Sequence, residues 1–256
     1  MTRFTIGVDL GTTGTKVVLL DPDGRILAQQ SAPADLYSPQ PGFAEADARQ
    51  WLDNVSSIIP ALLAAANVSP TSVVAIATTG MVPAVLFLDA AGAPLRRAIL
   101  QNDARATAEI SQLALRLEGL DVTEITGSAL TQQSVAPTLM WVREHEPEVW
   151  AATAHVVGSY DWLLMALGAR PHVERNWALE SGLFRVAGDR FEAVYEHARL
   201  DRDVVPGPAT AGTVVGALSV KAARMIGLPT GVSLVVGGAD HVLSAFAAGV
   251  DRPRTA

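Results

Sequence analysis

Short apolar runs with β-branched residues alternate along the chain with longer runs whose apolar positions recur at helical spacing. The first three short runs, residues 4–9, 15–21 and 25–31, are rich in β-forming residues. Residues 21–24, Asp-Pro-Asp-Gly, separate the second run from the third and are typical of a hairpin turn. The chain is therefore predicted to open with three antiparallel strands arranged as a meander.

Strand and helix patterns continue to alternate after this meander. Asp47 is predicted to cap a helix that reaches about residue 66. Further strands are predicted at residues 72–79, 84–89, 155–158 and 232–236. Further helices are predicted at residues 103–118, 137–145, 161–167, 221–226 and 240–248. This alternation is typical of the α/β class, whereas residues 170–201 show no clear pattern.

Composition narrows the class of protein. Of the 256 residues 49% are hydrophobic, which suffices for one large domain or two small ones. The formal net charge of −7 argues against nucleic-acid and membrane-surface partners. The chain has no cysteine, which excludes disulfides and suits a reducing cytoplasm. No apolar run is long enough to span a bilayer, so we expect an acidic, soluble, cytoplasmic protein.

The turn between the first two predicted strands, Asp-Leu-Gly-Thr-Thr-Gly at residues 9–14, is rich in glycine and threonine. Gly11 and Gly14 permit backbone conformations that are closed to other residues, so the N–H groups of this turn can converge on an anion. The Gly-Lys-Ser/Thr ending of a Walker A loop is absent. The turn is either a phosphate cradle or a plain hairpin, and its own sequence leaves both interpretations open.

Side chains around this turn favour a phosphate site with magnesium. Thr12 and Thr13 supply hydroxyl donors, and Lys16 supplies a positive charge. Asp9 stands at the end of a buried strand and can hold Mg²⁺ through water, because magnesium prefers oxygen ligands and keeps part of its hydration.

A second carboxylate, Asp240, opens the last predicted helix, directly after a strand that ends at Gly237 and Gly238. Because a helix N-terminus favours negative charge, Asp240 is predicted to be ionised and firmly held. A plain helix cap is the commoner role for such an aspartate, whereas the double glycine indicates a ligand that approaches closely. His241 either tunes its neighbour Asp240 or is an exposed residue at the start of the helix, and the exposed position is the one expected. The five histidines have no metal-ligand spacing.

Five segments resemble known proteins in the order in which a single family carries them. The pattern Asp-x-Gly-Thr-x-x-x-Lys at residues 9–16 resembles the first phosphate motif of the superfamily of actin-like, sugar-kinase and heat-shock ATPases. Four more segments resemble the FGGY carbohydrate kinases, and among them the xylulose kinases most. They are SPQPGFAEADARQW (38–51), AILQNDARA (98–106), ITGSALTQQSVAPTLMWVREHEPEVW (125–150) and VVGGADHVLSAFAAGV (235–250).

This resemblance covers nearly the whole chain and implies a fold and a reaction. The fold is a ribonuclease-H-like α/β domain in which the first three strands are antiparallel and the rest of the sheet is mixed. The reaction is ATP-dependent phosphorylation of a small sugar or polyol, such as the ketopentose xylulose. Asp240 would accept the proton of the attacking hydroxyl. Asp9 would serve Mg²⁺, and Gly11, Thr12, Thr13 and Lys16 would contact the phosphates of ATP.

The resemblance also implies sugar contacts, at Asn102 and Asp103. Both follow a short apolar run, where polar side chains at a strand end can meet a ligand. Asp103 can instead cap the predicted helix that follows it. Thr138 departs from the family, which often shows lysine at this position.

A second set of implied sugar contacts lies in the loop TTGMVPA, residues 78–84. This loop occupies the place where xylulose kinases show Gly-Gln-Met-His-Gly. Gly80 is kept, but Met81, Val82 and Pro83 replace Gln-Met-His and remove two side chains that can bond to a hydroxyl. A site that cannot pair a substrate hydroxyl discriminates poorly for that substrate.

In this family a C-terminal lobe carries a second phosphate loop and the adenosine pocket. We expect residues 1–251 to form the N-terminal lobe, residues 252–256 to begin a linker, and the chain alone to be nearly inactive as a kinase. A homodimer is a further expectation. Two rival functions stay open. One is an actin-like nucleotide-binding scaffold or regulatory domain, which needs neither Asn102 and Asp103 nor a base at Asp240. The other is a sugar-sensing module without turnover.

Overall fold

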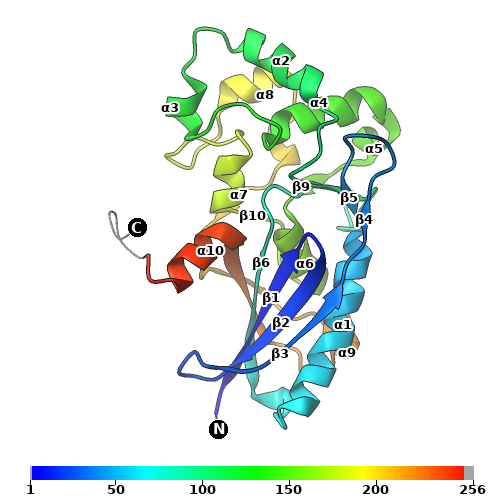
Figure 1. Ribbon diagram of the computed structural model, residues 1–256, viewed down its shortest axis with the longest axis vertical. Coiled ribbons are helices and arrows are strands. Elements are labelled where there is room, and N and C mark those ends of the chain that lie inside the picture. The colour runs from blue at the N-terminus through cyan, green and yellow to red at the C-terminus, as the bar shows by residue number, and fades with distance from the viewer. Residues whose placement is uncertain (1, 251–256) are drawn as a thin grey trace.

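The computed structural model describes residues 2–250, and its main feature is a mixed six-stranded sheet with the order β12-β13-β6-β1-β2-β3. Figure 1 shows this sheet in the lower half of an elongated molecule, with a group of short helices above it. The strands are β1 (Phe4–Gly11), β2 (Gly14–Leu20), β3 (Ile26–Pro33), β6 (Val73–Gly80), β12 (Val214–Ala217) and β13 (Ser233–Ala239).

The strand directions confirm the predicted meander and the mixed sheet. β1, β2 and β3 pair antiparallel, while β6 and β13 run parallel to β1, and β12 closes the far edge antiparallel to β13. The carbonyl of Asp21 accepts a hydrogen bond from Gly24 N, and its carboxylate accepts from the backbone of Asp23 and Arg25. These bonds form the predicted hairpin turn between β2 and β3.

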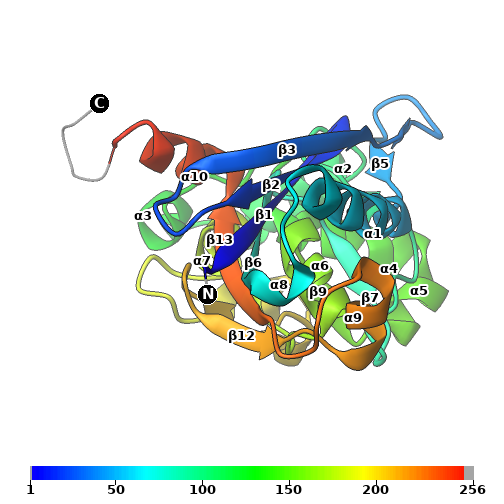
Figure 2. The ribbon, with the colours of Figure 1, turned by 90° about the horizontal axis from the view of Figure 1, so that it is seen from below.

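The two faces of the sheet differ in how they are covered. Helices α1 (Ala48–Ala65) and α6 (Ser159–Leu167) pack against one face, and α9 (Val220–Ile226) packs on both of them, as Figure 2 shows from below. Along β1, Ile6, Val8 and Leu10 are buried, whereas Gly7 and Asp9 alternate with them and are only partly covered. Since side chains of a strand alternate between faces, Asp9 lies on the face opposite α1, which carries α10 (Asp240–Ala247).

Helix α1 forms where the sequence predicts it. Asp47 occupies the N-cap, and its carboxylate accepts a hydrogen bond of 2.9 Å from Arg49 N. Such a cap stabilises a helix by about 1 kcal/mol. Trp51, Val55 and Ile58 recur on one side of the helix and are buried in the core.

Short elements build the upper part of the molecule. The strands are β4 (Leu36–Tyr37), β5 (Glu45–Ala46), β7 (Leu86–Leu88), β8 (Ala98–Ile99), β9 (His155–Val157), β10 (Val173–Glu174) and β11 (Pro208–Ala209). The helices are α2 (Thr107–Arg116), α3 (Val122–Thr126), α4 (Val135–His145), α5 (Pro147–Ala152), α7 (Arg175–Glu180) and α8 (Glu192–Ala198), with a 3-10 turn at Arg202–Val204. A second 3-10 turn, Pro70–Ser72, lies directly before β6. Within residues 2–250, no helix combines the length and the apolar character that a membrane crossing requires.

The prediction of a helix over residues 103–118 was wrong at its start, because α2 begins only at Thr107. Asp103 does not cap this helix. Its carboxylate accepts hydrogen bonds from the backbone of Ala44 and of Arg105, so these residues form a turn that joins α2 to a distant loop.

Candidate active site

The candidate site lies at the carboxyl ends of the three parallel strands β1, β6 and β13. Lys16, Asp9, Thr79 and Gly238 are register partners across four neighbouring strands, and Asp240 begins α10 directly after β13. In sheets with parallel strands, ligands bind at the carboxyl ends of the strands. Asp9 and Asp240 are 231 residues apart in the sequence, yet both lie at the carboxyl ends of strands that neighbour β6. Asp9 stands on β1, and Asp240 follows β13.

Backbone geometry explains the glycine pair before Asp240. β13 shifts register against β6 between Val236 and Gly238, and a Cβ atom at Gly237 would overlap the carbonyl oxygen of Thr78. The hydroxyl of Thr79 then donates a 2.7 Å hydrogen bond to the carbonyl of Gly238. Gly237 thus has a packing reason of its own, and the close approach of a ligand stays a prediction.

The turn at residues 11–14, the candidate phosphate-binding turn, is a tight two-residue hairpin. Gly11 and Gly14 pair with each other, which leaves Thr12 and Thr13 at the tip. Neither glycine is among the described residues with positive φ. Gly14 is required instead because a Cβ atom there would stand 2.7 Å from the carbonyl oxygen of Ala32 on β3. Anion binding by this turn, with Lys16 beside it, stays a prediction.

Asp9 is the carboxylate whose surroundings suit a cation. Burial raises its pKa, the nearby Lys16 lowers it, and the negative charge of Asp240 raises it again. Asp9 and Lys16 line a small hollow of about 160 Å³, together with Leu243 from α10. An added cation would relieve the repulsion between the two carboxylates, and Mg²⁺ in phosphate-transfer sites is commonly held by one or two carboxylates, waters and phosphates. The donor set at this edge therefore fits magnesium.

Asp240 faces a larger hollow of about 500 Å³. Ala239 is the N-cap of α10, so Asp240 is its first helical residue, and its side chain is 47% exposed. The hollow is mostly polar, and its lining is Val82, Gln101, Ser128, Ala129, Thr131, Gln133, Glu180, Asp240 and His241. Hydroxyl, amide and carboxylate groups of this kind can pair with the hydroxyls of a sugar.

The loop after β6 contributes to this hollow in part. Gly80 is required where it stands, since a Cβ atom there would lie 2.9 Å from the carbonyl oxygen of Leu10. Met81 is buried, with its sulfur 3.9 Å from the hydroxyl of Thr12, while Val82 lines the hollow. Direct contact of these three residues with a sugar stays a prediction.

Gln101 rather than its neighbours reaches the hollow. The described lining includes Gln101 but not Asn102 or Asp103. Asn102 is exposed, and the Asp103 side chain is only 2% exposed because it is held inside a network of charged groups. Their role as sugar ligands stays a prediction, to be judged against this internal role of Asp103.

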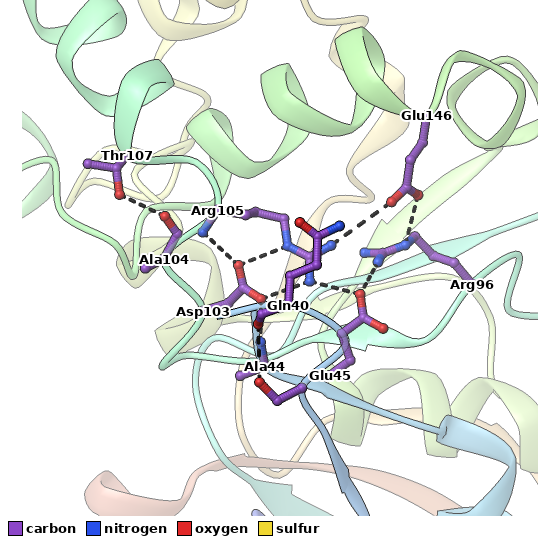
Figure 3. A network of polar contacts seen from close by, with 10 residues as sticks. Gln40, Ala44, Glu45, Arg96, Asp103, Ala104, Arg105, Thr107 and Glu146 are labelled. Carbon is purple, nitrogen blue, oxygen red and sulfur yellow. Dashed lines mark hydrogen bonds and ion pairs between the residues drawn. The ribbon is translucent and has the colours of Figure 1, made fainter. Parts of the chain in front are cut away.

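Figure 3 shows the network that holds Asp103. Arg105 donates from Nε and Nη2 to the two carboxylate oxygens of Asp103, both at 2.8 Å, and from Nη2 to Glu45 Oε1 at 2.8 Å. Arg96 links the same Glu45 to Glu146, with Nε 2.9 Å from Glu146 Oε2. The network joins the loop before α1 to the turn before α2, and so fixes the segment that carries Gln101.

Sequence reasoning missed several residues of the hollow, namely Gln101, Ser128, Thr131, Gln133 and Glu180. For His241 it favoured an exposed position over tuning of Asp240. Ser128, Thr131 and Gln133 stand inside segment 125–150, and Gln101 stands inside segment 98–106; both segments resemble the family, which was the available signal. Glu180 comes from the stretch without a clear pattern. The local sequence around these residues does not say that they meet at one hollow.

This sheet, with its carboxylates at the ends of parallel strands, defines the chain as a domain of the actin-like ATPase fold. The chain belongs to the FGGY family of carbohydrate kinases, whose N-terminal domain matches residues 4–247.

Individual relatives agree with this assignment. The chain is 31% identical to the xylulose kinase of Escherichia coli K12 over 246 residues, which cover 96% of the chain and 50% of that protein. It is 28% identical to the L-xylulose/3-keto-L-gulonate kinase of the same strain, covering 98% of the chain and 51% of that protein. The crystal structure of xylulose kinase from Rhodospirillum rubrum superposes with a TM-score of 0.92 at 40% identity, over 98% of the chain and 52% of that protein. The chain thus spans about half the length of the relatives it matches.

Proposed function

We propose that this chain is the N-terminal lobe of an ATP-dependent kinase that phosphorylates a hydroxyl of a small sugar. The observation that carries the proposal is the position of Asp240. Asp240 faces a polar hollow, and one strand, β6, lies between the end of β13 that it follows and Asp9 on β1. Membership in a carbohydrate kinase family supports it.

In the reaction, Asp240 acts as the general base. A sugar hydroxyl in the hollow gives its proton to the Asp240 carboxylate, and its oxygen forms a bond to the γ-phosphorus of ATP. The bond from that phosphorus to the bridging oxygen breaks, and ADP leaves with the bond electrons. A carboxylate that accepts the proton and aligns the oxygen contributes about 10²–10⁴-fold to the rate.

Asp9 and the hairpin after it serve the phosphates. Asp9 would hold Mg²⁺ through water, which would neutralise negative charge on ATP. Thr12 and Thr13 donate hydroxyl hydrogen bonds, Lys16 adds a positive charge, and the backbone at Gly11 allows close approach. The packing of Asp9 beside Lys16 supports this arrangement.

The substrate class is a ketopentose such as xylulose. The relatives named xylulose kinase support this choice. Met81 and Pro83 stand where the xylulose kinase pattern has glutamine and histidine, so recognition of the sugar hydroxyls falls on polar members of the hollow, Gln101 and Gln133 first among them.

A second lobe completes the nucleotide site in this proposal. The expected linker, residues 252–256, lies outside the described residues. The chain matches only about half the length of its relatives, which supports a second lobe. Without that lobe the chain has little kinase activity. Homodimer formation and a cytoplasmic location stay predictions.

The test is made on the full-length gene product. Thermal unfolding is measured with pentuloses, hexuloses and polyols, with and without Mg²⁺–nucleotide, because specific ligands stabilise the folded state by about 2.7 kcal/mol at a hundredfold excess over Kd. ATP-dependent phosphorylation of each sugar is measured in parallel. Asp240→Asn is the key variant, and Asp189→Asn is the matched control, since that carboxylate is exposed and away from the site.

Three outcomes separate the functions. Phosphorylation of one sugar that is lost in Asp240→Asn, with sugar binding retained, supports the kinase. A rise in the unfolding temperature with nucleotide, and none with any of the sugars, would favour a regulatory or scaffold domain. A shift with sugar but no turnover would favour a sugar sensor.

A further inference from the structure

His241 lies between two carboxylates at the mouth of the hollow. Its Nε2 atom is 3.1 Å from Glu180 Oε1, and its Nδ1 atom is 3.5 Å from Asp240 Oδ1. Its backbone N–H also donates a 2.6 Å hydrogen bond to the same Oδ1 atom. The ring is 58% exposed, whereas Glu180 is 27% exposed. The exposed position expected of His241 is present, but the ring has two anionic neighbours.

Buried contacts fix the position of Glu180. Glu180 ends helix α7, whose N-cap is the buried Glu174. The Glu174 carboxylate accepts hydrogen bonds from the backbone of Asn176 and Trp177 and from the hydroxyl of Tyr160, at 2.9, 3.3 and 3.1 Å. Helix α7 also packs against β13, the strand that leads into Asp240. The two carboxylates are thus carried by elements that pack on each other.

Burial and the charges of its neighbours act on Glu180 in opposite directions. Burial raises the pKa of Glu180, the neighbouring His241 lowers it, and the charges of Glu174 and Asp240 raise it. The ring lies between the two carboxylates, with one nitrogen facing each of them. Hydrogen bonds between ionised partners are roughly twice as strong as neutral ones.

We propose that His241 and Glu180 are positioning residues for Asp240, an inference that rests on the proposed kinase function. The backbone N–H and the ring of His241 engage Oδ1, which leaves Oδ2 free to accept the proton of the sugar hydroxyl. Glu180 orients the ring from its other side. Together they hold the carboxylate in the orientation that the reaction needs, and they act through Asp240 rather than on the phosphate.

The test compares steady-state kinetics of the full-length gene product and its variants. His241→Ala and Glu180→Ala are each expected to lower kcat about tenfold, with KM for the sugar within about twofold, because orientation of the base matters in the transition state. The double variant is expected to be no slower than either single one, because both residues act through one contact. Glu180→Gln keeps an acceptor for the ring and is expected to stay within about threefold of the wild-type kcat.

Controls separate this inference from the proposed function. Glu196→Ala removes an exposed carboxylate on α8 and is expected to leave kcat unchanged. If Asp240→Asn abolishes turnover while His241→Ala and Glu180→Ala leave kcat unchanged, or lower it independently so that their effects multiply, positioning by this pair is overturned and the kinase proposal stands. If Asp240→Asn retains full kcat, both fail.

Discussion

Gly237 is the residue at which the sheet tolerates least change. The register of β13 against β6 shifts beside it, and a Cβ atom there would overlap the carbonyl of Thr78. The backbone must therefore move if any side chain is added, and Asp240, three residues later, would move with it.

We expect Gly237→Ala to destabilise the protein by about 2–3 kcal/mol, since overpacking against a backbone atom cannot be relieved by a rotamer change. Gly207→Ala is the matched control, because no atom stands within 4 Å of a Cβ at that position, and it is expected to change stability by less than about 0.5 kcal/mol. Urea denaturation of the two variants measures both. Equal midpoints would contradict the overlap.

A second residue-scale feature is the fully buried pair of Asp161 and His172. His172 Nδ1 must donate to the carbonyl of Arg170, 2.9 Å away, so its Nε2 faces Asp161 Oδ1 at 3.5 Å. Burial raises the pKa of Asp161 well above its usual value and lowers the pKa of His172. The folded pair therefore holds one proton, on the carboxyl group, with both groups neutral.

This proton predicts a stability profile with pH. Above about pH 6.5 the unfolded state has released both protons while the folded pair keeps one, so stability falls as pH rises, by at most about 1.4 kcal/mol per unit. Below about pH 4 the unfolded state binds two protons and the folded pair one, so stability falls as pH falls. Between about pH 4 and 6.5 both states bind one proton, and the pair does not change stability with pH. Asp161→Asn keeps a hydrogen-bond donor toward His172 but has no titratable proton. Its stability is expected to fall less steeply above pH 6.5 than that of the wild type.

Urea denaturation at pH 5, 7 and 8.5 measures the difference between the two proteins. Asp23→Asn, in an exposed turn, serves as the control, and its profile is expected to run parallel to the wild type. A parallel profile for Asp161→Asn would show that the buried pair carries no extra proton.

At the scale of elements, charged groups join segments that local sequence does not connect. Arg105 bonds to Asp103 and Glu45, and its guanidinium lies 4.0 Å from the ring centre of Phe43. The loop before α1 and the turn before α2 are thus held by one side chain.

We expect Arg105→Ala to destabilise the protein by about 3–5 kcal/mol, because it leaves Asp103 and Glu45 buried with less compensating charge. Arg185→Ala removes an exposed arginine that pairs with an exposed aspartate, and it is expected to cost less than about 1 kcal/mol. Chemical denaturation compares them. A small effect at Arg105 would mean that Arg96 alone compensates the two carboxylates.

Sequence patterns predicted the long elements well. The meander and α1 follow periodicity, turn residues and a cap, which are local signals. β6 and α10 were also predicted, although Ala239 at the N-cap of α10 supplies no side-chain cap. The stretch 170–201 was unreadable because β10, α7 and α8 are two to seven residues long and are held by tertiary contacts, such as that of Glu174 with Tyr160. The start of α2 was misjudged for the same reason, since the partner of Asp103 lies 59 residues away.

At the scale of the whole molecule, the site is assembled from both ends of the chain. Asp9 and Asp240 were predictable because each stands in a motif with its own chemistry. Of the other residues that line the hollow, Val82 was named from the sequence, but Gln101, Gln133 and Glu180 were not, since they come from three separate segments without a shared local pattern.

The proposed division into lobes gives a prediction at this scale. The 256-residue chain is expected to show at most about 10⁻³ of the kcat of the full-length gene product, because positioning of ATP and exclusion of water need both lobes. Phosphorylation of the preferred sugar is measured for both proteins at equal molar concentration. Comparable rates would contradict the need for a second lobe.

The central position of β6 has a consequence for how such a protein can diverge. β1 and β13 flank β6, so Asp9 on β1 and the end of β13, which Asp240 follows directly, are two strand spacings or about 10 Å apart across the sheet. Backbone hydrogen bonds set this span, and side chains do not. A gene duplicate can therefore exchange the loops around the hollow while the sheet keeps this spacing unchanged; under the proposed function, such an exchange would change the nutrient that the protein accepts.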